Sequence, residues 1–233
     1  MFHNPFFGVH DKKLAVLVDP EKSNEKSIRQ IAEYEEVFDF FLVGGSSENC
    51  PVDAVVQAIK TYTGKPVILF PASHFQLTAK ADALLFLSLI SGRNPEFLIG
   101  QQVAAASFIK THRLLAIPTG YILIDGGKIS SVEKASRTKA LPASEVELIV
   151  STALAGELLG MQSIYLEAGS GALRPVPLSL IAEVKKNISV PLIAGGGIRS
   201  NEQLHECWAS GADVVVIGNA IEEDPHLLRT FTR

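Results

Sequence analysis

The 233-residue sequence is poor in cysteine and has no excess of positive charge. Its two cysteines, Cys50 and Cys207, are too few for a disulfide framework and lack the spacing of a metal site. Lysine and arginine number 21 against 25 aspartates and glutamates, which gives a net charge of −4. A nucleic-acid-binding protein needs a basic surface, so we expect no nucleic-acid partner.

Long apolar runs are also missing. The strongest run covers residues 83–90, far short of the about 20 residues that a membrane-spanning helix needs. The first residues lack the basic start and apolar stretch of a signal peptide. We therefore expect a cytoplasmic protein. Its 47% hydrophobic residues are enough for a large core, and its length favours a single domain over residues 1–233.

Short apolar runs alternate with amphipathic stretches, the pattern of parallel β-α-β units. The apolar runs predict eight strands, at 14–18, 38–43, 67–70, 83–89, 114–118, 163–166, 191–194 and 213–217. The amphipathic stretches predict helices at 27–36, 51–61, 95–110, 143–159, 178–186 and 201–210. Eight such strands favour a (β/α)8 barrel. Between two apolar runs, Asp125-Gly126-Gly127 predicts a hairpin turn within an insertion over residues 121–139.

The third connection of this barrel is unusually short. The segment from Pro66 to Asp82 resembles the one from Pro191 to Asp213, but it spans 16 positions where the later one spans 22. The residues left over, 71–81, hardly suffice for a crossover helix, which needs about a dozen residues with its loops. We predict that the third helix is reduced or replaced by a loop, which would let a long ligand leave the barrel sideways. An ordinary short loop without that consequence is the alternative.

Two glycine turns follow the last two predicted strands. Gly195-Gly196-Gly197 ends the seventh strand, and Gly218-Asn219 ends the eighth. Glycine lets the backbone approach a ligand and offer bare N–H groups, and a following helix adds its positive end. Turns at this place in a (β/α)8 barrel are typical of a phosphate site.

Further polar residues follow other strands, where a barrel carries its chemistry. Asp19 ends the first strand and Ser46 follows the second. One carboxylate and a nearby hydroxyl suit Mg²⁺, which takes few protein ligands and keeps water or substrate oxygens. Helix capping is the competing interpretation for both residues.

Six motifs at the strand ends occur in an order that is specific as a set. They are Asp-Pro-Glu-Lys at 19–22, Val-Gly-Gly-Ser at 43–46, Ile-Leu-Phe-Pro at 68–71, Tyr-Leu-Glu-Ala-Gly-Ser-Gly at 165–171, Ala-Gly-Gly-Gly-Ile-Arg at 194–199 and Ile-Gly-Asn at 217–219. Together they resemble the geranylgeranylglyceryl phosphate synthase family, whose bacterial relatives include heptaprenylglyceryl phosphate synthases. One departure is Leu17, where some bacterial relatives carry a lysine.

The resemblance implies a Mg²⁺-dependent prenyltransferase with a modified (β/α)8 barrel that lacks a regular third helix. Such an enzyme joins the 3-hydroxyl of sn-glycerol 1-phosphate to a polyprenyl diphosphate, geranylgeranyl or similar, as an ether and releases diphosphate. It implies that Asp19 and Ser46 bind Mg²⁺. It also implies that the glycerol phosphate lies among residues of the last three strand ends: Tyr165, Glu167, Ala168, Gly169, Ser170, Gly171, Gly196, Gly197, Gly218 and Asn219.

Several roles remain open at this level. Asp19 would act in catalysis by binding the Mg²⁺ that neutralises the diphosphate leaving group. Glu167 is either the general base for the glycerol hydroxyl or a group that only orients this hydroxyl. Tyr165 packs on glycerol, donates to phosphate, or is a core tyrosine. The prenyl chain would follow apolar residues near the short connection: Phe70, Phe75, Phe86, Phe97, Leu98, Ile99 and Tyr121.

Other functions and partners also stay open. A sugar-phosphate isomerase using Asp19 and Glu167 is the alternative enzyme, while an aldolase would need a lysine inside a strand, which is missing. A barrel that binds phosphate without catalysis is a further alternative. The lipid substrate implies transient contact with a membrane surface, and apolar helix faces such as residues 97–99 suggest a homo-oligomer.

Overall fold

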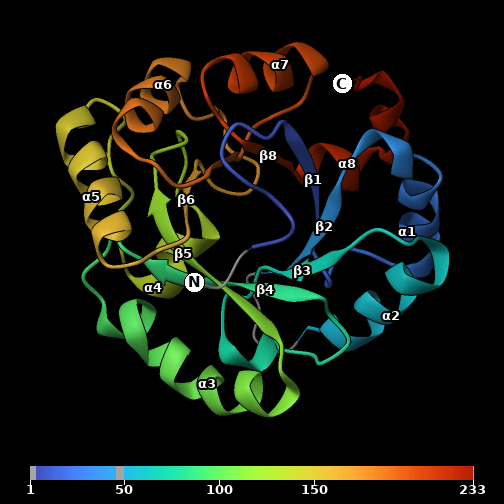
Figure 1. The fold of residues 1–233 in the computed structure, drawn as a ribbon. Coiled ribbons are helices and arrows are strands. Elements are labelled where there is room, and N and C mark those ends of the chain that lie inside the picture. The colour runs from blue at the N-terminus through green and yellow to red at the C-terminus, as the bar shows by residue number, and fades with distance from the viewer. Residues whose placement is uncertain (1–3, 46–49, 233) are drawn as a thin grey trace.

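The computed structural model describes residues 4–45 and 50–232, which form a closed barrel of eight parallel strands (Figure 1). Each strand pairs with its neighbours in chain order, and β8 closes the barrel on β1. The strands are β1 (Lys13–Val18), β2 (Phe40–Val43), β3 (Val67–Leu69), β4 (Ala83–Leu89), β5 (Leu115–Leu123), β6 (Ser163–Glu167), β7 (Leu192–Gly195) and β8 (Val214–Ile217). The predicted barrel is therefore confirmed.

Helices surround this barrel (Figure 1). The α-helices are α1 (Glu25–Ala32), α2 (Val52–Tyr62), α3 (Gln101–His112), α4 (Ser131–Ser136), α5 (Val146–Leu158), α6 (Leu178–Asn187), α7 (Asn201–Ala209) and α8 (Asn219–Glu223). Short segments of other helix types are η1 (Glu35–Val37), η2 (His74–Gln76), η3 (Glu96–Gly100, directly before α3) and η4 (Pro225–Thr230). Among the described residues no helix has both the length and the apolar character to cross a membrane.

The third barrel helix is absent, as the short connection predicts. Between β3 and β4 the described chain forms only the single turn η2, so α2 and α3 are successive helices of the ring (Figure 1). Gln76 of this turn is almost fully buried and ties two loops together. Its Nε2 donates to the Gly45 carbonyl at 2.8 Å, and its Oε1 accepts from the Ala72 N–H at 2.9 Å. These bonds hold the connection in place of helix packing.

The predicted hairpin turn at residues 125–127, within the insertion at 121–139, is wrong. Residues 121–123 continue β5, because β4 pairs with it up to Tyr121 and β6 pairs with it up to Leu123. The strand thus finds partners on both sides and has no free edge for a hairpin. The following segment forms α4, which begins at a capping box made by Ser130 and Glu133. This Ser-x-x-Glu pattern is a helix signal that the sequence already carried.

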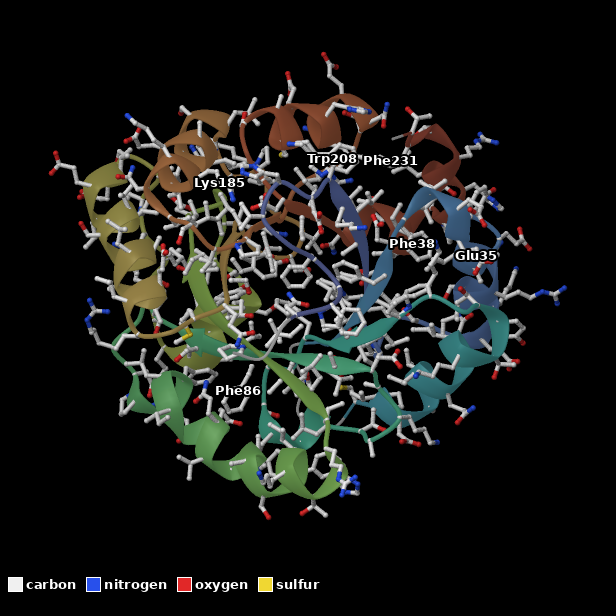
Figure 2. The ribbon with its side chains drawn as sticks, in the orientation of Figure 1. Glu35, Phe38, Phe86, Lys185, Trp208 and Phe231 are labelled. Atoms are coloured by element: carbon white, nitrogen blue, oxygen red, sulfur yellow. The ribbon has the colours of Figure 1, made fainter. Side chains whose placement is uncertain are left out.

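The core has two layers. Inward-facing side chains such as Phe40, Ile68 and Ile193 fill the barrel, while a larger outer layer lies between the strands and the helices. Phe38, Trp208 and Phe231 belong to this outer layer (Figure 2). Phe7 closes the end of the barrel where the strands begin, since it is buried and stacks on Phe40 at a ring distance of 5.8 Å. The opposite end stays open for a ligand.

Candidate active site

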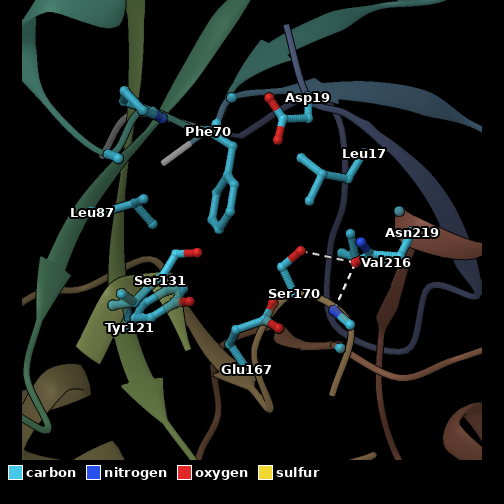
Figure 3. Close-up of a pocket in the computed structure, with 18 of the residues that line it drawn as sticks. Leu17, Asp19, Phe70, Leu87, Tyr121, Ser131, Glu167, Ser170, Val216 and Asn219 are labelled. Carbon is cyan, nitrogen blue, oxygen red and sulfur yellow. Dashed lines mark hydrogen bonds between the residues drawn. The ribbon is translucent and has the colours of Figure 1, made fainter. Parts of the chain in front are cut away.

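A cavity of about 280 Å³ lies at the end of the barrel where the strands finish. Loops that follow most of the strands contribute to its lining, which is why residues far apart in the sequence meet there. Figure 3 shows Asp19 and Glu167 on opposite sides of the cavity. A ligand that reaches from one carboxylate to the other would therefore cross the barrel mouth.

Asp19 directly follows β1 and faces the cavity. Its Oδ1 accepts from the Glu21 N–H at 3.0 Å, and its Oδ2 lies 3.1 Å from the Lys22 Nζ. Asp19 is not the N-cap of the following helix, because Asn24 caps α1. Gly45 leaves the space that this carboxylate needs, since a Cβ at Gly45 would lie 2.6 Å from the Asp19 Oδ1.

Lys22 links Asp19 to a residue from the other end of the chain. Its Nζ lies 3.2 Å from the Glu222 Oε2, and the two partners are 200 positions apart. Burial works against the charged form of Lys22, but its contacts with Asp19 and Glu222 outweigh this and raise its pKa. Burial also raises the pKa of Glu222. Sequence reasoning missed Glu222, because no motif or spacing marks a partner at such a distance.

Glu167 is the last residue of β6 and is 6% exposed. Its Oε1 accepts from the Gly169 N–H at 2.7 Å. Burial raises the pKa of this carboxyl group, while the Tyr165 hydroxyl and the Gly169 N–H partly oppose the shift. A buried carboxylate with a raised pKa that still faces a cavity is well placed to accept a proton from a ligand.

Three aromatic rings pack together beside Glu167. The Tyr165 ring lies 5.4 Å from the rings of both Phe70 and Tyr121, and Phe70 and Tyr121 are 6.0 Å apart. Phe70 and Tyr121 line the cavity, whereas Tyr165 is fully buried. Its hydroxyl lies beside the Glu167 carboxylate and lowers the pKa of that group. Burial and the charge of Glu167 raise the pKa of both tyrosines well above the usual range.

The glycine turns meet the loop after β6. Gly196 and Gly197 have φ values of +87° and +79°, which side chains rarely adopt. A Cβ at Gly196 would also lie 2.5 Å from the Glu167 Oε1. Asn219 joins the neighbouring loops, because its Oδ1 accepts from the Ser170 hydroxyl at 2.9 Å and from the Gly171 N–H at 2.7 Å (Figure 3).

The structure brings most of the predicted site residues together. Lining the cavity are Asp19, Glu167, Ser170, Gly171, Gly196, Gly197, Gly218 and Asn219. Ala168 is buried, and its N–H donates to the Gly195 carbonyl at 3.0 Å. Gly169 contacts Glu167 through the hydrogen bond from its N–H to the carboxylate. Ser46 lies outside the described residues. Within residues 4–45 and 50–232, no group of three histidine, cysteine or acidic side chains is arranged to hold a metal.

The remaining wall of the cavity is apolar. Of the predicted prenyl track, Phe70, Phe97 and Tyr121 line the cavity. A second cavity of about 30 Å³ shares a wall with it and is lined by Phe86 and by residues of η2, β4 and α3. This smaller cavity lies at the side where the third helix is absent. Phe75 and Ile99 are exposed.

The barrel and the site define the class of protein. A closed (β/α)8 barrel with glycine turns after its last two strands belongs to the class of (β/α)8-barrel proteins, in which those turns frequently form a phosphate site. The sequence profile of the PcrB family matches residues 8–233. The chain belongs to the PcrB family.

Relatives with assigned names agree with this membership. Geranylgeranylglyceryl phosphate synthase of Zunongwangia profunda is 50% identical over 216 residues, which are 92% of each chain. The protein of the same name from Pyrococcus furiosus is 44% identical over 211 residues, 89% of this chain and 83% of that one. The resemblance seen in the strand-end motifs is thereby confirmed.

A solved structure of a relative has the same fold as this chain. (S)-3-O-geranylgeranylglyceryl phosphate synthase from Thermoplasma acidophilum, in complex with its substrate sn-glycerol-1-phosphate, matches with a TM-score of 0.87 and 32% identity. The match covers 94% of this chain and 90% of that one. Thiamine phosphate pyrophosphorylase from Pyrococcus furiosus, at 15% identity and a TM-score of 0.59, shares the barrel alone.

Proposed function

We propose that this protein is a prenyltransferase that joins sn-glycerol 1-phosphate to a polyprenyl diphosphate through an ether bond and releases diphosphate. The observation that carries the proposal is the cavity itself. It places a carboxylate at each side, glycine turns beside one of them and an apolar wall between. The membership of the PcrB family and the substrate in the related Thermoplasma acidophilum structure support this choice of reaction.

Glycerol phosphate would lie on the side of Glu167. Its phosphate fits the bare backbone of Gly196 and Gly197 and the Asn219 side chain, while its 3-hydroxyl points to Glu167. We propose that Glu167 takes the proton of that hydroxyl as the new C–O bond forms. Its raised pKa makes it a stronger base than an exposed carboxylate. Holding the hydroxyl in place lowers the entropic barrier as well.

The diphosphate would lie on the side of Asp19, and the donor set there suits Mg²⁺. A Mg²⁺ site in which one or two carboxylates are completed by substrate phosphates needs no cage of protein ligands. Asp19 faces the cavity and Gly45 leaves its carboxylate uncovered, so Asp19 would hold the ion, with Ser46 as the second proposed ligand. The bound ion would neutralise charge on the diphosphate leaving group. Lys22 supplies a further positive charge at this side.

The prenyl tail would follow the apolar wall toward the smaller cavity, where the third helix is absent. We propose contact with a membrane surface only through this lipid substrate, and a cytoplasmic location. Both cysteines are free, which fits a reducing compartment. We also propose self-association. Exposed apolar side chains support it, with Leu158 at 86% exposed and Leu159 at 77%, and light scattering would test it.

The test is an incubation of the protein with glycerol 1-phosphate, Mg²⁺ and labelled prenyl diphosphates of several lengths, followed by mass spectrometry of the lipid product. We expect an ether product that depends on Mg²⁺. Absence of product with every chain length would overturn the proposal. Asp19→Ala should abolish turnover, while Asp53→Ala, on the outer surface of α2, should keep it.

A further inference from the structure

Lys128 is a cation that the sequence motifs do not include and that lies beside the glycine-rich loop after β6. A Cβ at Gly171 would lie 2.8 Å from the Lys128 Nζ and 3.8 Å from the Asn219 Nδ2. Both nitrogen atoms therefore lie near the bare side of Gly171, a residue that lines the cavity. Two donor groups that converge beside a glycine of a phosphate cradle form an anion-binding arrangement.

The loop that carries Lys128 is held against the loop after β6. The Gly126 carbonyl accepts from the N–H groups of Leu173 at 2.9 Å and Arg174 at 3.0 Å. A Cβ at Gly126 would lie 2.2 Å from the Ala168 carbonyl oxygen, so the two backbones are in direct contact. These contacts fix the position of the Lys128 backbone, and the Lys128 side chain is long enough to place its Nζ beside Gly171.

Both donors are also free to bind. The Asn219 Oδ1 is used by Ser170 and Gly171, which leaves its Nδ2 without a hydrogen bond among the described residues. In residues 4–45 and 50–232, Lys128 makes no ion pair. The nearby Arg174 is paired with Asp125 at 3.6 Å. No acidic side chain in the part of the chain that the structure describes therefore neutralises the positive charge of Lys128.

We propose that Lys128 binds the phosphate of the acceptor substrate together with the Asn219 Nδ2. The inference rests on the proposed function for the identity of that phosphate ester. The role of Lys128 is to hold the phosphate beside Gly171. Its loss should weaken binding of the acceptor and leave the chemical step alone.

The experiment compares binding of inorganic phosphate and of sn-glycerol 1-phosphate by calorimetry, at fixed ionic strength, in the unmodified chain and in variants. For Lys128→Met we expect Kd to rise about ten-fold for both ligands, about 1.4 kcal/mol. Lys128→Arg should restore most of the affinity, because the charge returns. Lys134→Met is the matched control, since Lys134 is an exposed lysine of the neighbouring α4 whose atoms are not among those nearest to a Cβ at Gly171.

Kinetics separate this role from a structural one. In Lys128→Met the KM for glycerol phosphate should rise by the same factor, with kcat and the KM for prenyl diphosphate unchanged. Equal phosphate binding by the Lys128→Met and Lys134→Met variants would overturn the inference, as would no phosphate binding by the unmodified chain. If Lys128→Met unfolds at lower temperature, Lys128→Gln provides the same comparison. Phosphate binding that depends on Lys128 without any ether product would instead count against the proposed function alone.

Discussion

Replacing Gly45 by alanine tests whether the position of Asp19 matters for turnover. The added methyl group would lie 2.6 Å from the Asp19 Oδ1, 3.2 Å from its Cγ and 3.5 Å from the Pro20 Cδ. An ordinary contact starts at 3.4 Å, so the carboxylate must move by about 0.8 Å. Its bonds to the Glu21 N–H and to Lys22 would lengthen with it.

This displacement predicts a large kinetic effect with a small effect on stability. A shift of about 1 Å in a group that positions the reacting atoms costs about 100-fold in rate, so we expect turnover to fall about 10- to 100-fold. The alanine also restricts the unfolded chain, which favours the folded state by about 0.4–1 kcal/mol and offsets part of the clash. We therefore expect a thermal midpoint within about 4 °C of that of the unmodified protein.

The assay is the initial rate of ether formation, measured over a range of Mg²⁺ concentrations, with the thermal midpoint followed in parallel. Gly64→Ala is the matched control, because no atom lies within 4 Å of a Cβ at that position. Displacement of Asp19 should also raise the Mg²⁺ concentration needed for half the maximal rate. A Gly45→Ala enzyme as fast as Gly64→Ala at every Mg²⁺ concentration would refute the reasoning.

Two further predictions concern the carboxylate on the other side of the cavity. Glu167→Gln should abolish turnover. It should also preserve or raise the thermal midpoint, and more so as the pH rises, because a raised folded-state pKa means that ionisation of Glu167 costs stability toward high pH; a midpoint that falls equally at every pH would contradict this. Tyr165→Phe should cost about 1 kcal/mol of stability, because it removes the contact of one hydroxyl with the Glu167 carboxylate and keeps the packing of the ring. It should also move the acid limb of the kcat/KM pH profile to higher pH, since that hydroxyl lowers the pKa of Glu167, and an unmoved limb would count against Glu167 as the base.

Most of the fold could be predicted from the chain alone. The eight apolar runs became the eight strands, and the short third connection became the single turn η2. The hairpin prediction failed, because the apolar run after residue 118 pairs with β4 and β6 on both sides and so extends β5. The capping box at Ser130 and Glu133 was the local signal for the helix that follows.

It was also predictable in outline that the site residues lie together at one end of the barrel. Parallel strands in one barrel end at the same face, so motifs that follow β1, β6, β7 and β8 must meet there. The glycines of these motifs are local features, since the positive φ values of Gly196 and Gly197 belong to their own turns. What the motifs could not indicate is how deeply each side chain lies. Tyr165 is completely buried two positions before Glu167, which faces the cavity.

The sequence by itself therefore determined the order of the strands, the missing third helix and the residue types at the strand ends. Each of these depends on neighbouring residues and on the period of the apolar pattern. Only the tertiary structure decided that Lys22 bridges Asp19 and Glu222, that Asn219 holds the loop at Gly171, and that Lys128 lies beside them. These contacts join segments up to 200 positions apart, and closure of the barrel, which no local pattern encodes, brings them together.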